Sequence, residues 1–167
     1  LGGRWGFIDL AGKIVINPQF ERAGAFSEGL AAVRLGRRWG FIDKTGKLVV
    51  NPQFDDVHDF AKGLAPARVG KLWGFVDASG QLAINPQFDE ADTLTEDLAR
   101  VKIAGRWGFI DKSGKYAINP QFDEAAHVLK RAVGCFSFNL CRKMEGSRSL
   151  QCRRPNLGSP VALTNRL

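Results

Sequence analysis

Four Trp-Gly dipeptides divide most of the chain into units of equal length. Trp5, Trp39, Trp73 and Trp107 follow one another at intervals of 34 residues, with no insertion or deletion between them. A fixed period of this length is typical of a repeat array, in which each unit forms one small element that stacks on its neighbours. The period therefore constrains the fold more than any other feature of the chain.

Each unit carries the same residues around its tryptophan. In the second unit these are Trp-Gly-Phe-Ile-Asp at 39–43, Gly-Lys at 46–47 and Asn-Pro-Gln-Phe at 51–54, followed by Asp55. A more variable stretch, Phe-Ser-Glu-Gly-Leu-Ala at 26–31 in the first unit, separates these strings. Three positions that all four units share are expected to be structural: the glycines Gly6, Gly40, Gly74 and Gly108, the aspartates Asp9, Asp43, Asp77 and Asp111, and the prolines Pro18, Pro52, Pro86 and Pro120.

Apolar and polar residues alternate within each unit, a period of two that predicts β-strands. The alternation over 31–35 predicts a first strand, and the string at 39–43 predicts a second. Asp at the first position and Gly at the fourth position of 43–46 predict a type I turn whose carboxylate accepts backbone N–H groups. A third strand over 47–51 completes a meander, and we expect Pro52 to end its pairing because proline lacks a ladder donor.

A three-stranded meander of this size cannot bury a face of its own, so neighbouring units must stack and share a core. Trp39 and Phe41 fall on one face of the second strand and Ile42 falls on the other, and we expect the tryptophans to be buried in that core. Gly40 removes a side chain where another backbone or a ring must approach closely. The sequence thus predicts an all-β fold of tandem three-stranded β-meanders in an open solenoid-like or propeller-like array.

The strings Trp-Gly-Phe-Ile-Asp, Gly-Lys, Asn-Pro-Gln-Phe and Phe-Ser-Glu-Gly-Leu-Ala resemble the WG-repeat family, which is found largely in bacterial proteins. The resemblance covers residues 1–128 as four copies in phase, the first of them truncated at its amino end. It implies an all-β repeat array that is often read as an interaction module. It brings no catalytic residues, and the sequence predicts neither a metal site nor a cofactor.

The repeat pattern breaks inside the fourth unit. After Val128 the chain continues with Leu-Lys-Arg where the repeat requires Ser-Glu-Gly-Leu-Ala. Residues 129–167 show neither alternation nor a helical stripe, so we expect an aberrant, basic and largely disordered tail. A shift of reading frame would explain a break inside a unit, and a genuine tail forming a short cap is the alternative. Cys135, Cys141 and Cys152 all lie in this tail, at spacings that match no metal-binding pair.

The net charge and the hydropathy of the chain limit the classes of binding partner to be expected. Of the net charge of +7, residues 1–131 carry +2, from 18 Lys and Arg against 16 Asp and Glu, and residues 132–167 carry +5, from 6 against 1. So small an excess over the repeats does not favour a nucleic-acid groove. No apolar run approaches the ~18 residues that cross a bilayer, so we predict no membrane span. Because Leu1 falls inside a motif, we expect the amino end to be missing or processed, which leaves the compartment open.

Few residues of the chain suggest catalysis or metal binding. Carboxylates can serve in acid–base catalysis or hold Ca²⁺, but each aspartate of the shared series begins its own tight turn, and that role accounts for it. His58 and His127 occupy repeat positions that differ by one residue, so they form no ladder and are expected to be surface side chains. We therefore expect no enzyme.

Two repeated sets are candidates for binding. Arg34, Arg68 and Lys102 share one position on the polar face of the first strand and would form a basic stripe once the units stack. These side chains are either paired with acids such as Glu28 or Asp59, or free to contact an anion, a glycan or an acidic peptide. The second set is a row of indoles: where the four tryptophans are partly exposed, they could stack on sugars or peptides. We expect a scaffold that binds protein or cell-envelope glycan, or else repeats that only space or support an activity in another domain.

Overall fold

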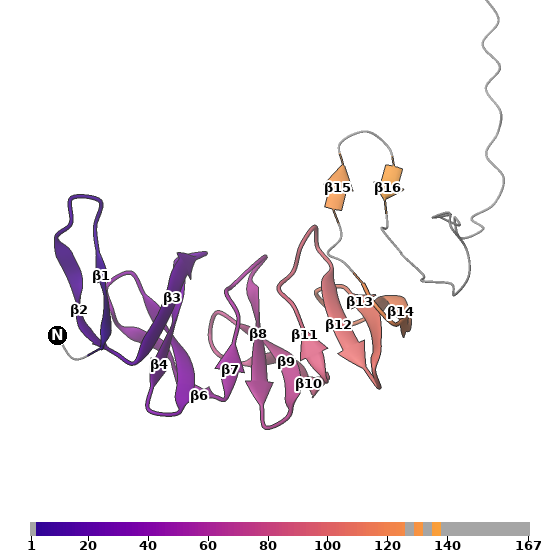
Figure 1. Cartoon of the computed structure of the whole chain (residues 1–167), viewed down its shortest axis with the longest axis horizontal. Helices are drawn as coiled ribbons and strands as arrows, with labels where there is room; N and C mark the ends of the chain where they lie inside the picture. Colours follow the sequence, from indigo (N-terminus) through magenta and orange to yellow (C-terminus); the bar gives the residue numbers. More distant parts are fainter. Residues whose placement is uncertain (1–2, 126–128, 132–134, 138–167) are drawn as a thin grey trace, which may run out of the picture.

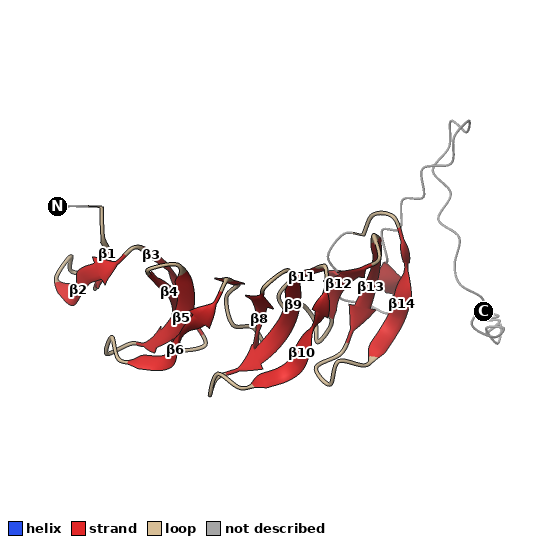
Figure 2. Cartoon of the chain, turned by 90° about the horizontal axis from the view of Figure 1, so that it is seen from below, coloured by secondary structure: helices blue, strands red, loops and turns tan. Residues whose placement is uncertain are grey.

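The computed structural model describes residues 3–125, 129–131 and 135–137. These residues form strands, turns and loops, and no helix occurs among them, which confirms the all-β class. The sheets follow one another along the long axis of the molecule (Figure 1). The first and last repeat sheets lie at opposite ends, so the array is open and does not close into a ring (Figures 1 and 2).

Four antiparallel sheets carry the repeats. The first sheet contains β1 (Trp5–Ile8) and β2 (Ile14–Phe20), and the second contains β3 (Arg22–Ser27), β4 (Leu30–Leu35), β5 (Arg38–Asp43) and β6 (Leu48–Phe54). The third contains β7 (Asp56–Val57), β8 (Leu64–Val69), β9 (Leu72–Asp77) and β10 (Leu82–Phe88), and the fourth contains β11 (Glu90–Ala91), β12 (Ala99–Ile103), β13 (Arg106–Ile110) and β14 (Tyr116–Phe122).

The region expected to be a disordered tail, 129–167, falls largely outside the described residues. Within it the structure describes a pair of short antiparallel strands, β15 (Leu129–Arg131) and β16 (Cys135–Ser137). His127, Cys141 and Cys152 lie outside the described part of the chain.

The full sheet has four strands, whereas the sequence predicts three. The three expected strands are present as β4, β5 and β6 of the second sheet, and β3 pairs with β4 as an additional strand. Its counterparts β7 and β11 are two residues long, too short to show an alternation. Because each of these strands comes from the end of the preceding sequence unit, every full sheet draws on two consecutive units.

Pro52 does not end the third strand, so that prediction is wrong. β6 continues to Phe54, which pairs with Trp39, while Val50 pairs with Phe41. Between these two pairs β6 bulges, with three residues opposite Gly40 alone. β6 is the edge strand of its sheet, where proline is tolerated because no further strand requires its missing donor.

Gly40 makes this bulge possible. A Cβ atom at Gly40 would lie 2.4 Å from the carbonyl oxygen of Val50 and 2.8 Å from the nitrogen of Pro52. Both are backbone atoms that cannot move aside without breaking the pairing. The close approach expected at this position is therefore present, and the same clash would arise at the equivalent glycines Gly6, Gly74 and Gly108.

Each pair of neighbouring sheets encloses one apolar core, as the repeat period predicts. Phe41 and Phe54 of the second sheet pack with Phe60 and Val76 of the third. Ile42, on the opposite face of β5, lies in the core shared with the first sheet. Phe41 and Ile42 are both 0% exposed, so a single strand contributes to two cores at once.

Polar contacts also join neighbouring sheets. The hydroxyl of Ser27 donates to the carbonyl oxygen of Phe60 at 2.7 Å. The carboxylate of Glu28 accepts the backbone N–H groups of Lys62 at 2.7 Å and Gly63 at 2.8 Å. These bonds connect the β3–β4 loop of the second sheet to the loop before β8 of the third, so they help to fix the second sheet against the third.

The tight turns after the Trp-Gly strands are held by their aspartates. Oδ1 of Asp77 accepts hydrogen bonds from the backbone N–H and the hydroxyl of Ser79, at 2.8 and 2.6 Å, and from the N–H of Gln81 at 3.0 Å. These donors, the Ser79 hydroxyl first among them, lower the pKa of Asp77 below its ordinary value. The pKa values of Asp43 and Asp111 are lowered in the same way by Thr45 and Ser113.

Replacing Gly74 by Ala should destabilise the array strongly, because the new Cβ would meet the Ile84 carbonyl oxygen at 2.5 Å. Forcing an extra carbon into a filled site costs about 1–3 kcal/mol. Gly24→Ala is the matched control, since its nearest contact is a movable side-chain oxygen of Asp59 at 3.3 Å. Urea unfolding should show a large loss of stability for Gly74→Ala and little for Gly24→Ala. Equal stabilities of the two variants would refute a backbone clash at the bulge.

Ser79→Ala should raise the pKa of Asp77 and leave the pKa values of Asp43 and Asp111 unchanged, as measured by carboxyl NMR titration. A carboxylate whose pKa is lowered on folding stabilises the protein above its unfolded pKa of ~3.9, and this contribution is lost as the pH falls through the folded pKa. The melting temperature of the wild-type chain should therefore fall more steeply below about pH 4 than that of Ser79→Ala. An unchanged Asp77 titration would contradict the role assigned to the hydroxyl.

Candidate functional site

A basic residue lies beside each of three tryptophans at the same place in successive sheets. Arg34 of β4 is the register partner of Trp39 of β5, and Arg68 of β8 is the partner of Trp73 of β9. Lys102 pairs with Trp107 in the same way, across β12 and β13. Each pair lies next to the hairpin turn that joins its two strands, so the array presents an indole and a cation in every full sheet along one edge, which we call the hairpin edge.

The basic side chain of each pair also lies close to an acidic side chain. Arg34 Nε lies 3.5 Å from Glu21, Arg68 forms an ion pair with Asp56 at 3.3 Å, and Lys102 forms one with Glu90 at 2.8 Å. The three basic side chains are 28–35% exposed and the three acids 42–55%. The surface is therefore a row of ion pairs that are partly exposed to water.

These acids are not the ones the sequence suggests. Glu28 is occupied by the backbone N–H groups of the next sheet, and no ion pair joins Asp59 to the basic row within the described residues. The true partners Asp56 and Glu90 lie on β7 and β11, directly opposite Arg68 and Lys102. These two strands could not be predicted from the sequence, so the acids on them could not be identified.

The tryptophans are only partly buried, so the expectation of full burial in the core is wrong. Trp39, Trp73 and Trp107 are half-buried, and Trp5 is 55% exposed. In the three full sheets the buried ring of the triplet is the phenylalanine, as at Phe75, which is 0% exposed. The tryptophans lie within two residues of the hairpin turn, at the rim of the stacked sheets, where the next sheet covers them incompletely.

Cations lie over the indole rings of Trp73 and Trp107. The guanidinium carbon of Arg68 is 5.8 Å from the centre of the Trp73 ring, and the imidazole of His58 lies 4.8 Å from the same indole, tilted by 56°. Lys102 Nζ is 5.2 Å from the Trp107 ring. Contacts of this kind contribute roughly 0.5–1 kcal/mol at exposed sites and hold the indoles in a fixed orientation.

Arg100 belongs to the site but is not predicted by the sequence analysis. Its guanidinium carbon lies 4.3 Å from the Trp107 ring, and its side chain forms an ion pair with Asp92 at 2.6 Å and donates to the carbonyl oxygen of Ala125. In earlier units the same position holds Ala32 and Pro66. Comparing unit with unit would have shown this position as an exception, but it would not have shown its contact with the indole.

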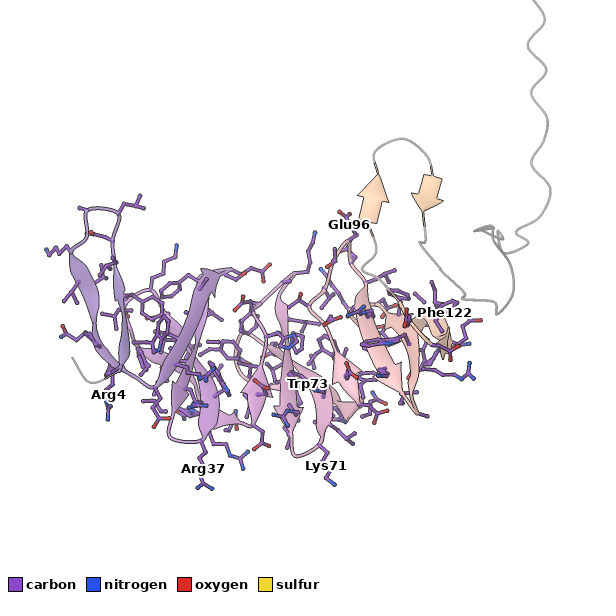
Figure 3. The ribbon with its side chains drawn as sticks, in the orientation of Figure 1. Arg4, Arg37, Lys71, Trp73, Glu96 and Phe122 are labelled. Carbon is purple, nitrogen blue, oxygen red and sulfur yellow. The ribbon has the colours of Figure 1, made fainter. Side chains whose placement is uncertain are left out.

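Further basic side chains lie near the hairpin edge, Arg37 and Lys71 in hairpin turns and Arg4 directly before β1. Arg4, Arg37 and Lys71 lie along one edge of the molecule in successive sheets (Figure 3). All three are exposed, and within the described residues no ion pair involves them. The turns that carry two of them are capped by the acids that follow Asn-Pro-Gln-Phe: Glu21 accepts the N–H of Gly36 at 3.1 Å, and Asp55 accepts that of Gly70 at 2.7 Å.

In the described part of the chain no group of three or more His, Cys, Asp or Glu side chains is placed to hold a metal ion. The turn aspartates are separated from the hairpin edge by the length of a strand, and their Oδ1 atoms accept turn hydrogen bonds. No helix suited to spanning a membrane occurs among the residues that the structure describes.

Comparison with known proteins identifies the repeat. The model of the WG containing repeat matches residues 5–38, 39–73, 73–107 and 107–128, four consecutive copies that cover most of the chain. Searches of curated proteins and of solved structures gave no significant match. The chain therefore belongs to the WG containing repeat family.

Proposed function

We propose that this chain is a non-catalytic binding scaffold whose ligand-binding surface is the hairpin edge. The observation that carries the proposal is the repetition of one arrangement, a half-buried indole beside a basic side chain and its acid, at the same register in three successive sheets. Tryptophan and arginine are the residue types most enriched where proteins recognise partners, because both give a large flat contact area with polar groups at its border.

The array gives these groups a rigid support. Cross-strand pairing positions the indoles, and cations over the rings of Trp73 and Trp107 restrain these two further, so little side-chain entropy is lost when a ligand stacks on them. Repetition adds a second advantage, because several weak contacts made by one long ligand combine into a tighter complex. A protein segment and a cell-envelope glycan are the two partner classes that such a surface suits.

The absence of catalysis is part of the proposal. The pKa values of the turn aspartates Asp43, Asp77 and Asp111 are lowered, and each shift arises from hydrogen bonds that hold a turn. In the alternative function the repeats only space or support an activity carried by another domain. In that case the hairpin edge would contact nothing specific.

Site-specific photo-crosslinking separates these two functions. A photoreactive residue at position 71 lies at a hairpin tip, and one at position 44 lies in a turn at the other end of a hairpin, where Lys44 is also exposed. After illumination in extracts and envelope fractions of the source organism, we expect a discrete adduct from position 71 and none from position 44. Equal labelling at the two positions, or none at position 71, would favour the spacer function instead.

A further inference from the structure

We infer that the hairpin edge receives an extended, proline-rich peptide in the polyproline II conformation, with acidic residues that face the first three sheets. This inference rests on the proposed function and specifies its ligand. It is drawn from three properties of the edge: the period of its indoles, the way each indole is held, and the position of the cations without an acidic partner.

The period of the indoles selects the ligand conformation. Stacked sheets lie ~10 Å apart, so an array with one indole per sheet repeats at about that distance. A polyproline II helix has three residues per turn and a rise of ~3.1 Å, which gives a turn of about 9.3 Å. A β-strand presents the same face every ~6.7 Å and an α-helix turns every ~5.4 Å, so neither stays in step with the sheets. A polyproline II chain can therefore place one residue in three on successive indoles.

The surroundings of each indole suit proline. Polyproline II ligands bind in grooves lined with aromatic rings, and because their backbone is already ordered they lose little entropy on binding. Trp73 is half-buried and contacts both Arg68 and His58, which restrain the ring while part of it remains accessible. The same strand position is occupied by Trp39 in the preceding sheet and by Trp107 in the following one.

The cations of the hairpin edge indicate which residues the ligand should carry besides proline. Arg34, Arg68 and Lys102 are already paired with acids, so they attract a second anion weakly. Arg4, Arg37 and Lys71 have no such partner among the described ion pairs, and they extend from the first three sheets along one edge (Figure 3).

The fourth sheet differs from the first three. It has Gly105 where the second and third sheets have Arg37 and Lys71, and its Arg106, which occupies the repeat position of Arg4, forms an ion pair with an aspartate at 3.8 Å. Acidic residues of the ligand should therefore lie over the first three sheets and not over the fourth.

The test uses the full chain and a fluorescently labelled peptide of four Pro-Pro-Glu triplets, with binding followed by anisotropy. A peptide of four Gly-Ser-Glu triplets has the same length and charge without the preformed helix. We expect the proline peptide to bind on the order of tenfold more tightly, because less ordering entropy is lost. Its binding should also shift the indole N–H NMR signals of Trp39 and Trp73. Equal affinity for the two peptides, or none for either, overturns the inference.

Charge reversal tests where the peptide lies. Arg37→Glu together with Lys71→Glu should weaken binding of the Pro-Pro-Glu peptide on the order of tenfold. Lys13→Glu with Lys44→Glu is the matched control, since it makes the same charge change in turns at the other end of the hairpins. Melting temperatures of both double variants establish that they fold. Equal loss of binding in the two double variants would overturn the placement on the hairpin edge.

A β-1,4-linked N-acetylglucosamine hexamer completes the test as a probe of the other ligand class. If it shifts the indole signals and the proline peptide does not, the scaffold function stands and the peptide inference fails. If position 71 captures a partner in the photo-crosslinking experiment while the proline peptide fails to bind, again only the ligand assignment is lost. If neither probe binds and position 71 captures nothing, both the inference and the proposed function fail.

Discussion

The apolar core shared by each pair of neighbouring sheets is the interaction on which the structure depends. β5 supplies Phe41 to the core in front of it and Ile42 to the core behind it, and both side chains are fully buried. A sheet removed from its neighbours would expose both faces, and a small sheet with two exposed apolar faces is not stable in water. Stability is therefore a property of neighbouring pairs of sheets, which is why the sequence repeats as a unit rather than as independent domains.

The Trp-Gly-Phe triplet connects this core to the hairpin edge. Gly40 allows the backbone of β6 to bulge against β5, and the bulge brings Val50 opposite Phe41 while Phe54 stays opposite Trp39. Phe41, which is buried, and Trp39, at the rim of the stacked sheets, therefore each gain an apolar partner from the same edge strand. Because Trp39 is so close to the hairpin turn, the geometry that fills the core also leaves an indole at the surface in every unit.

Much of the fold could be predicted from the sequence because the period of 34 residues and the alternation within it are both local signals. Strands β4, β5 and β6, the stacking and the assignment of Phe41 and Ile42 to opposite faces follow from them. The fourth strand could not be predicted, since β7 holds only two residues and pairs through tertiary context. That omission extends to the site, because the acids that pair with Arg68 and Lys102 lie on β7 and β11.

The energies at the hairpin edge argue that its residues do more than stabilise the array. An ion pair open to water contributes about 0–1 kcal/mol, and a cation over an exposed ring contributes a similar amount. Burying a whole phenylalanine contributes roughly 1.5–3 kcal/mol, and each full sheet already has such a ring in the same triplet. The half-exposed indole therefore adds less to the core than its size would allow. A large aromatic side chain that is held in place, partly uncovered and bordered by charge is better suited to recognising a ligand than to filling a core.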